Sequence, residues 1–160
     1  MSVEERYLSE PGPMGLFTRL ARVGLLVDAF QHRCLDPFGL KFVDFSVLRV
    51  LHLAGPPYQM SPTELADVLL RSSGGMTQIL DRLEQAGLVE RGSDASDRRK
   101  VVVRLTDDGV DTAQRASAAY ARERRRILRA LPPDEVEPVD TAVRRLLEVF
   151  TDDAERAANA

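Results

Sequence analysis

Apolar residues recur every three or four positions near both ends of the chain, and this spacing predicts long helices there. Successive apolar positions are separated by 4, 3, 4, 3 and 4 residues near the N-terminus and by 3, 4, 3 and 4 near the C-terminus. These positions are Leu16, Leu20, Val23, Val27, Phe30 and Cys34, and then Val136, Val139, Val143, Leu146 and Phe150. Such narrow seams fit packing within one helical bundle and equally fit an intertwined dimer.

A third helix is predicted between Thr106 and Leu131, where Arg124 interrupts the apolar seam. The seam consists of Val110, Ala113, Ser117, Tyr120, Ile127 and Leu131. A helix over 42–53 is also predicted, ended by the Gly55-Pro56-Pro57 turn. We expect its apolar residues to be mostly buried, namely Phe42, Phe45, Leu48, Val50, Leu51 and Leu53.

Two shorter helices follow. Ser61-Pro62-Thr63-Glu64 is a capping box with proline at the first helical position, so a helix should run from Pro62 to about Leu69. The next helix should begin near Ser72 or Ser73 and end at Ala86, before Gly87. Two helices around a tight polar turn make a helix-turn-helix candidate.

The second of these helices has two different faces. Its apolar side contains Met76, Ile79, Leu80 and Leu83, and the other contains Gly74, Gly75, Thr77, Gln78, Asp81 and Arg82. Small and hydrogen-bonding groups suit entry into a DNA groove. Adjacent glycines should each cost about 0.8–1.0 kcal/mol relative to alanine, which indicates a need for close approach. The alternative is an ordinary amphipathic helix with a loose N-terminus.

Two β-prone runs, Leu88–Arg91 and Val101–Leu105, come directly after this helix. In the second run Val101, Val103 and Leu105 should share one face. The linker GSDASDRRK is too polar to pack and ends in three cations. This pattern predicts a hairpin wing whose arginine enters the narrow, electronegative minor groove.

Composition narrows the function classes. With 160 residues, 44% of them hydrophobic and 29% charged, the chain can form a globular core. A net charge of −3 argues against coating nucleic acid by bulk charge, although a few local cations can position a sequence-specific binder. The first 13 residues lack the order of a signal peptide and no apolar run could span a bilayer, so we expect a cytoplasmic protein without a membrane partner.

The chemistry-bearing residues are few and scattered. The two histidines, His32 and His52, and the single cysteine, Cys34, form no catalytic or metal-binding pattern. We therefore expect no enzymatic activity, cofactor or metal. Cys34 lies on the apolar seam, which favours a buried core residue over a redox sensor.

The run RSSGGMTQILDRLEQAGLVERGSDASDRRKVVVRLTDDG resembles the recognition helix, wing and following helix of MarR-family regulators. Its pieces DRLE, GLVER, SDRR and LTDDG follow the family order, and GLKFVDFSVLRVL and SPTELADVLL are similar to the two preceding helices. The resemblance implies a mainly α fold with a small β-hairpin wing. This fold is a winged helix-turn-helix with N- and C-terminal dimerisation helices. The implied organisation is a flexible arm at 1–13, a dimerisation region at 14–40 and 106–150, a DNA-binding domain at 41–105 and a flexible tail at 151–160.

The resemblance also implies a function, that of a ligand-responsive repressor that binds a palindromic operator in double-stranded DNA as a homodimer. Its effector would be small and aromatic or anionic, and the absence of tryptophan argues against the urate-responsive branch. The implied DNA-binding residues are Ser72, Ser73, Gly74, Thr77, Gln78, Arg82, Arg98 and Arg99, with Asp97 orienting a wing arginine. Arg82 would act on the DNA backbone or structurally. The alternatives are a winged-helix module for protein contacts and a redox-responsive regulator that uses Cys34.

Overall fold

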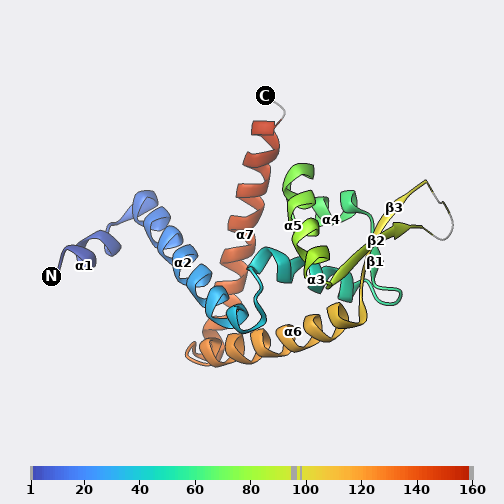
Figure 1. The fold of residues 1–160 in the computed structure, drawn as a ribbon. Coiled ribbons are helices and arrows are strands. Elements are labelled where there is room, and N and C mark those ends of the chain that lie inside the picture. The colour runs from blue at the N-terminus through green and yellow to red at the C-terminus, as the bar shows by residue number, and fades with distance from the viewer. Residues whose placement is uncertain (1, 95–96, 98, 159–160) are drawn as a thin grey trace. The chain divides into compact units, whose positions relative to one another are not determined.

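The computed structural model describes residues 2–94, 97 and 99–158, which form helices and one small sheet (Figure 1). The elements are α1 (Val3–Leu8), α2 (Gly12–Leu35), the short 3-10 helix η1 (Asp36–Phe38), α3 (Phe42–Leu53), β1 (Gln59–Met60), α4 (Pro62–Val68), α5 (Ser73–Gln85), β2 (Val89–Ser93), β3 (Val101–Leu105), α6 (Asp107–Leu128) and α7 (Pro133–Ala158). The chain divides into two compact units, Met1–Tyr120 and Ala121–Ala160. The predicted mainly α fold with a small β wing is confirmed.

The helices of the first unit begin where local sequence signals place them. Helix α3 has the predicted bounds, but Phe42 and Leu53 are 37% and 69% exposed, so their predicted burial is wrong. Leu53 follows the fully buried Leu51 by two positions, which places it on the opposite side of the helix. At the start of α4 the Ser61 amide donates to Glu64 Oε2 at 2.8 Å, and the Glu64 amide donates to Ser61 Oγ at 3.2 Å. The predicted capping box is therefore present.

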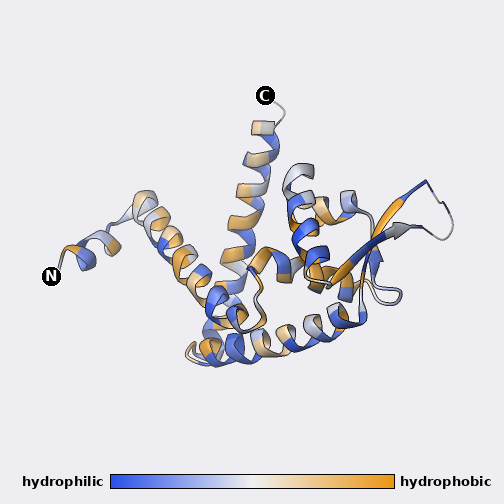
Figure 2. Cartoon of the chain, in the orientation of Figure 1, coloured by the Kyte–Doolittle hydropathy of each residue, from blue (hydrophilic) through white to orange (hydrophobic). Residues whose placement is uncertain are grey.

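Helices also form in the two segments predicted to be flexible, 1–13 and 151–160. In the first, Ser2 and Glu5 form a second capping box at the start of α1. In the second, α7 continues to Ala158 because the run after Phe150 contains no glycine or proline to end it. Figure 2 shows hydrophobic residues recurring along both α2 and α7.

The sheet has three antiparallel strands in the order β1-β3-β2, one more than the predicted hairpin. The additional strand is β1, which pairs Gln59 with Arg104 and Met60 with Val103. Strand β2 continues past the predicted end to Ser93, which pairs with Val101. Figure 1 shows β2 and β3 extending away from α3, α4 and α5 as a wing.

The predicted alternation along β3 holds only at its inner end. Val103 and Leu105 are buried, but Val101 is 53% exposed because it is the first residue of β3, at the outer end of the wing. Val102, on the opposite face, is only 7% exposed and lines a cleft beside Met60 and Pro62.

The core of the first unit joins α3, α4, α5 and the sheet to the end of α2 and to α6. Its largest fully buried side chains include Phe45, Leu48, Leu51, Leu65, Met76, Leu80 and Leu83. Tyr120 of α6 packs against the rings of Phe30 and Phe45, with centroids 5.3 and 5.4 Å away. Cys34 is 8% exposed within this core, which confirms the prediction of a buried residue. The core thus fixes α5 and the root of the wing in one body.

Candidate nucleic-acid interface

Helix α5 presents a polar face to solvent and an apolar face to the core. Ser72 is its N-cap, and the Gly75 amide donates to Ser72 Oγ at 3.2 Å. The buried residues are Met76, Ile79, Leu80 and Leu83, as the sequence predicted. Among the predicted DNA-binding residues, the exposed ones on or next to α5 are Ser72, Ser73, Gly74, Thr77 and Gln78. The structure therefore brings these five together at the N-terminal part of one helix.

The two glycines of α5 have different surroundings. A Cβ atom built at Gly75 would lie 3.2 Å from Ser72 Oγ, so the cap explains the glycine there. A Cβ atom at Gly74 would meet nothing within 4 Å. Packing within the described chain gives no reason for glycine at position 74, although glycine lowers helix stability.

Arg82 is held toward the core. Its Nη2 donates to Asp44 Oδ1 of α3 at 2.5 Å, and its Nη1 donates to the Gln78 carbonyl at 3.3 Å. Asp44 is 6% exposed and also accepts from the Lys41 amide at 3.2 Å. The Asp44 carboxylate thus accepts hydrogen bonds from the backbone at the start of α3 and from the Arg82 guanidinium of α5. This pair fastens α5 to α3, and of the two roles inferred for Arg82 the geometry favours the structural one.

Arg91 connects α5 to the wing. Its Nη2 donates to Asp81 Oδ1 at 2.6 Å, its Nη1 pairs with Glu84, and its amide donates to Glu84 Oε1 at 3.2 Å. The hydrogen bond with Asp81 raises the pKa of Arg91 above its usual value, with Glu84 contributing further. The sequence interpretation missed this cluster. The available signal was two acids three positions apart on one helix, followed by a cation on the next strand.

The end of β3 is fastened to the turn that precedes β2. Thr106 Oγ1 donates to the Gly87 carbonyl at 2.7 Å and accepts from the Gly109 amide at 3.0 Å, which starts α6. Gly109 lies so close to the Leu88 carbonyl that a Cβ atom there would approach its oxygen to 1.9 Å. The inner ends of both wing strands are therefore fixed against α6.

Asp97, in the outer part of the wing, accepts hydrogen bonds from two described residues that follow it. Its Oδ1 accepts from the Arg99 amide at 3.1 Å and from Arg99 Nε at 3.3 Å, and its carbonyl accepts from the Lys100 amide at 2.9 Å. The Arg99 side chain is 92% exposed. Asp97 therefore holds an exposed cation at the end of the wing. Arg98, the other predicted wing arginine, lies outside the described residues.

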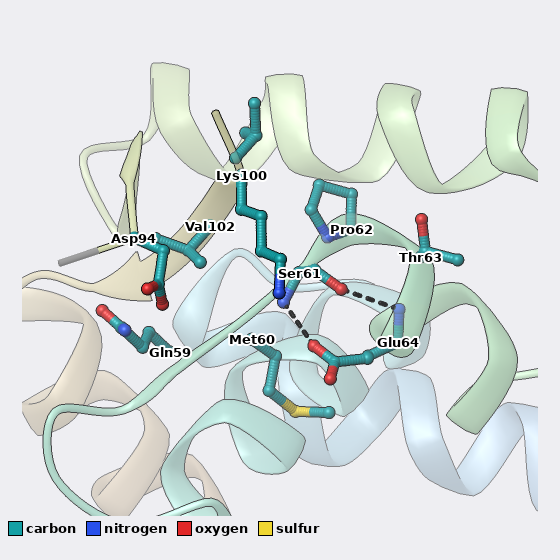
Figure 3. A pocket seen from close by; sticks show the side chains of 10 residues that line it. Gln59, Met60, Ser61, Pro62, Thr63, Glu64, Asp94, Lys100 and Val102 are labelled. Carbon is teal, nitrogen blue, oxygen red and sulfur yellow. Dashed lines mark hydrogen bonds between the residues drawn. The ribbon is translucent and has the colours of Figure 1, made fainter. Parts of the chain in front are cut away.

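An open cleft of about 740 Å³ separates the wing from α4 (Figure 3). Asp94 and Lys100 line it from the wing side, and Ser61 and Glu64 line it from α4. The backbone hydrogen bond from Ser61 lowers the pKa of Glu64, the Ser61 side chain adds to this, and Lys100 contributes least. Across the described residues, no group of three or more His, Cys, Asp or Glu side chains could hold a metal ion.

Comparisons with known proteins identify the family. Residues 38–100 match the family model described as MarR family. The transcriptional regulator PecS of Dickeya dadantii is 33% identical over 123 residues, covering 77% of this chain and 74% of PecS. The chain belongs to the MarR family. It is a DNA-binding transcription regulator with a winged-helix fold, as the sequence predicted.

Solved structures of MarR-family proteins are similar over most of the chain. AbsC from Streptomyces coelicolor has a TM-score of 0.72 at 25% identity, covering 95% of this chain and 97% of AbsC. A cysteine-to-serine mutant of MarR from E. coli, complexed with operator DNA, has a TM-score of 0.70 at 26% identity, covering 86% and 99% of the two chains. The relatives are regulators rather than enzymes. No helix in the described part of this MarR-family chain is long and apolar enough to cross a membrane.

Proposed function

We propose that the chain is a cytoplasmic repressor that binds a palindromic operator as a homodimer and responds to a small aromatic or anionic effector. The observation that carries the DNA-reading part is the solvent-facing surface of α5. Gly74, Thr77 and Gln78 are exposed there, whereas the neighbouring Asp81 and Arg82 are engaged in ion pairs. This leaves a small, uncharged and hydrogen-bonding surface, which suits base edges in the major groove.

The wing and the helix cap supply backbone contacts in this proposal. Ser72 and Ser73 lie at the start of α5, where hydroxyls and amides can bind phosphates. Arg98 and Arg99 enter the adjacent minor groove, and the hydrogen bonds that Arg99 donates to Asp97 support the orientation assigned to Arg99. For Arg82, the pair with buried Asp44 supports a structural role rather than direct contact.

Two exposed apolar rows support the homodimer. On α2, Leu16, Val23 and Val27 are 40%, 55% and 43% exposed, although they belong to the predicted seam. On α7 residues of the predicted seam are exposed too, with Val136, Val139 and Val143 between 42% and 52% exposed. Long apolar rows of this kind mark surfaces that a partner covers. A second copy related by two-fold symmetry would cover both rows. The resulting dimer would present one α5 from each protomer, and two symmetric helices fit the two half-sites of a palindrome.

Selection of bound duplexes from a random DNA pool by the purified protein tests this function. We expect a palindromic motif whose half-sites lie about 10 base pairs apart, or a multiple of this. With Gln78→Ala, the preference at one position per half-site should weaken, since a bidentate contact to adenine is worth about 1–3 kcal/mol. Gln85→Ala is the matched control because Gln85 is also exposed but lies at the opposite end of α5.

Failure to enrich any motif would contradict the proposal and favour a module for protein contacts. Such a module needs exposed large apolar side chains on α5, and the described residues of this helix expose none. A redox-responsive regulator would need an accessible thiol, whereas Cys34 is buried.

A further inference from the structure

Leu70 has a backbone conformation that leucine disfavours. Its φ is +51°, in the left-handed region, and it lies in the turn between α4 and α5. The turn is a Schellman motif, in which the Leu70 amide donates to the Asp67 carbonyl at 3.3 Å and the Arg71 amide donates to the Ala66 carbonyl at 2.9 Å. Glycine is the usual residue at this position because a Cβ atom crowds the following carbonyl. The turn would therefore form more favourably with glycine.

The fold makes no use of the leucine side chain. Tyr58 is the other described residue with a positive φ that is not glycine, and its ring stacks on His52 and packs against the core. The side chain thus explains the backbone conformation at Tyr58. Leu70, in contrast, is 85% exposed. Because no contact within the described chain explains the left-handed conformation of Leu70, we look for a contact between its exposed side chain and another molecule.

The location of Leu70 indicates what that contact is. It precedes Ser72, the cap of α5, by two residues, so it is within about 7 Å of the proposed DNA surface along the chain. When the N-terminal part of a recognition helix enters the major groove, the helix before it crosses the DNA backbone. The turn between them then faces the sugar–phosphate wall of the groove. An aliphatic side chain there meets the apolar face of a deoxyribose.

We propose that Leu70 packs against a deoxyribose of the DNA backbone at the edge of each half-site, and this rests on the proposed function. The contact is apolar and does not depend on sequence. It therefore strengthens binding to all duplexes alike and releases no counterions, so it leaves the salt dependence of binding unchanged. The left-handed conformation of Leu70 is retained because the side chain serves DNA binding rather than folding.

Two variants of Leu70 separate the side chain from the backbone. Leu70→Ala removes the aliphatic contact and keeps the strained φ, whereas Leu70→Gly removes the contact and relieves the strain. Leu53→Ala is the matched control, because Leu53 is also an exposed leucine but lies at the end of α3. The probes are the duplex selected by the wild-type protein and a scrambled duplex of equal length, each titrated at several salt concentrations.

Both Leu70 variants should raise the Kd about fivefold for both duplexes, the effect of uncovering part of one leucine. The slope of log Kd against log salt should stay at the wild-type value. Leu70→Gly should also raise the thermal midpoint by about 2 °C, and Leu53→Ala should bind DNA as the wild type does.

Three results would overturn the inference. If both Leu70 variants bind as the wild type does while the wild type binds DNA, the leucine makes no DNA contact and the proposed function stands. If only one of them loses affinity, the turn backbone rather than the side chain is responsible. A wild-type protein that binds neither duplex would remove the proposed function together with this inference.

Discussion

Arg91 of β2 donates a hydrogen bond to Asp81 of α5 across 2.6 Å, and so joins the first strand of the wing to the helix that faces DNA. The same guanidinium pairs with Glu84, one turn further along α5. A planar guanidinium can bind two carboxylates in fixed directions, whereas an ammonium group cannot. The angle between α5 and the wing is therefore set in part by one side chain.

Replacing Arg91 should disturb both stability and DNA binding. Arg91→Ala leaves two carboxylates facing each other without a cation, and we expect the free energy of unfolding to fall by about 1 kcal/mol. Operator affinity should fall as well, and Arg91→Lys should recover stability more fully than affinity. Urea unfolding and DNA titration measure the two effects. Arg104→Ala is the control, because its pair with Glu90 is half exposed and should contribute little.

Gly74→Ala should separate helix stability from DNA binding. Because a Cβ atom at this position meets nothing within 4 Å, alanine should stabilise α5 by up to about 1 kcal/mol. If position 74 approaches the DNA closely, the same methyl group should weaken operator binding by an order of magnitude. Thermal unfolding of this variant measures the change in stability, and DNA titration of the same variant measures the change in operator affinity. A more stable protein with unchanged affinity would show that Gly74 does not adjoin DNA.

The capping box of α4 should make stability depend on pH in the acid range. The folded protein lowers the pKa of Glu64, chiefly through the Ser61 amide, so the carboxylate stabilises the fold above its unfolded pKa. This contribution is lost as the pH falls through the lowered pKa. The difference in unfolding free energy between wild type and Glu64→Gln should therefore be constant near neutral pH and should decrease toward zero at acid pH. A gap that does not change with pH would contradict this assignment.

The apolar row of α7 should hold two copies together. Val143→Asp with Leu146→Asp places two charges in that row, and burying them unpaired would cost several kcal/mol, so the dimer should dissociate or the chain unfold. Sedimentation of wild type and variant, with circular dichroism to follow helix content, distinguishes these results. A wild-type protein that sediments as a monomer at micromolar concentration would refute the homodimer.

The wing arginines should govern the salt dependence of binding. Arg98→Ala with Arg99→Ala should raise the operator Kd by an order of magnitude or more and reduce the salt slope by about 0.9 for each lost phosphate contact. Asp97→Asn is the matched variant. It weakens the link to Arg99 but keeps both cations, so affinity should fall slightly without a lower slope. Parallel slopes for wild type and double mutant would show that the wing does not touch DNA.

Features that depend on residues close together in the chain could be predicted from the sequence alone. The bounds of α3, the capping box at Ser61 and the apolar face of α5 follow from hydrogen bonds and side-chain periods that span three or four positions. The order of motifs in the winged helix also indicated the family and its DNA-binding function, and the exposed start of α5 lies where these motifs place it.

Contacts between segments far apart in the chain could not be predicted from these local patterns. Two-residue strand β1 is too short to have a period, and it exists only because β3 offers an open edge. Val102 is only 7% exposed although it lies on the face opposite Val103, and it shares the lining of one cleft with Met60 and Pro62 from an earlier part of the chain. Asp44 and Arg82 are 38 positions apart, and only the packing of α3 on α5 brings them within 2.5 Å. A charged residue has many potential partners in the sequence, and burial selects one because an unpaired charge in the interior is unstable.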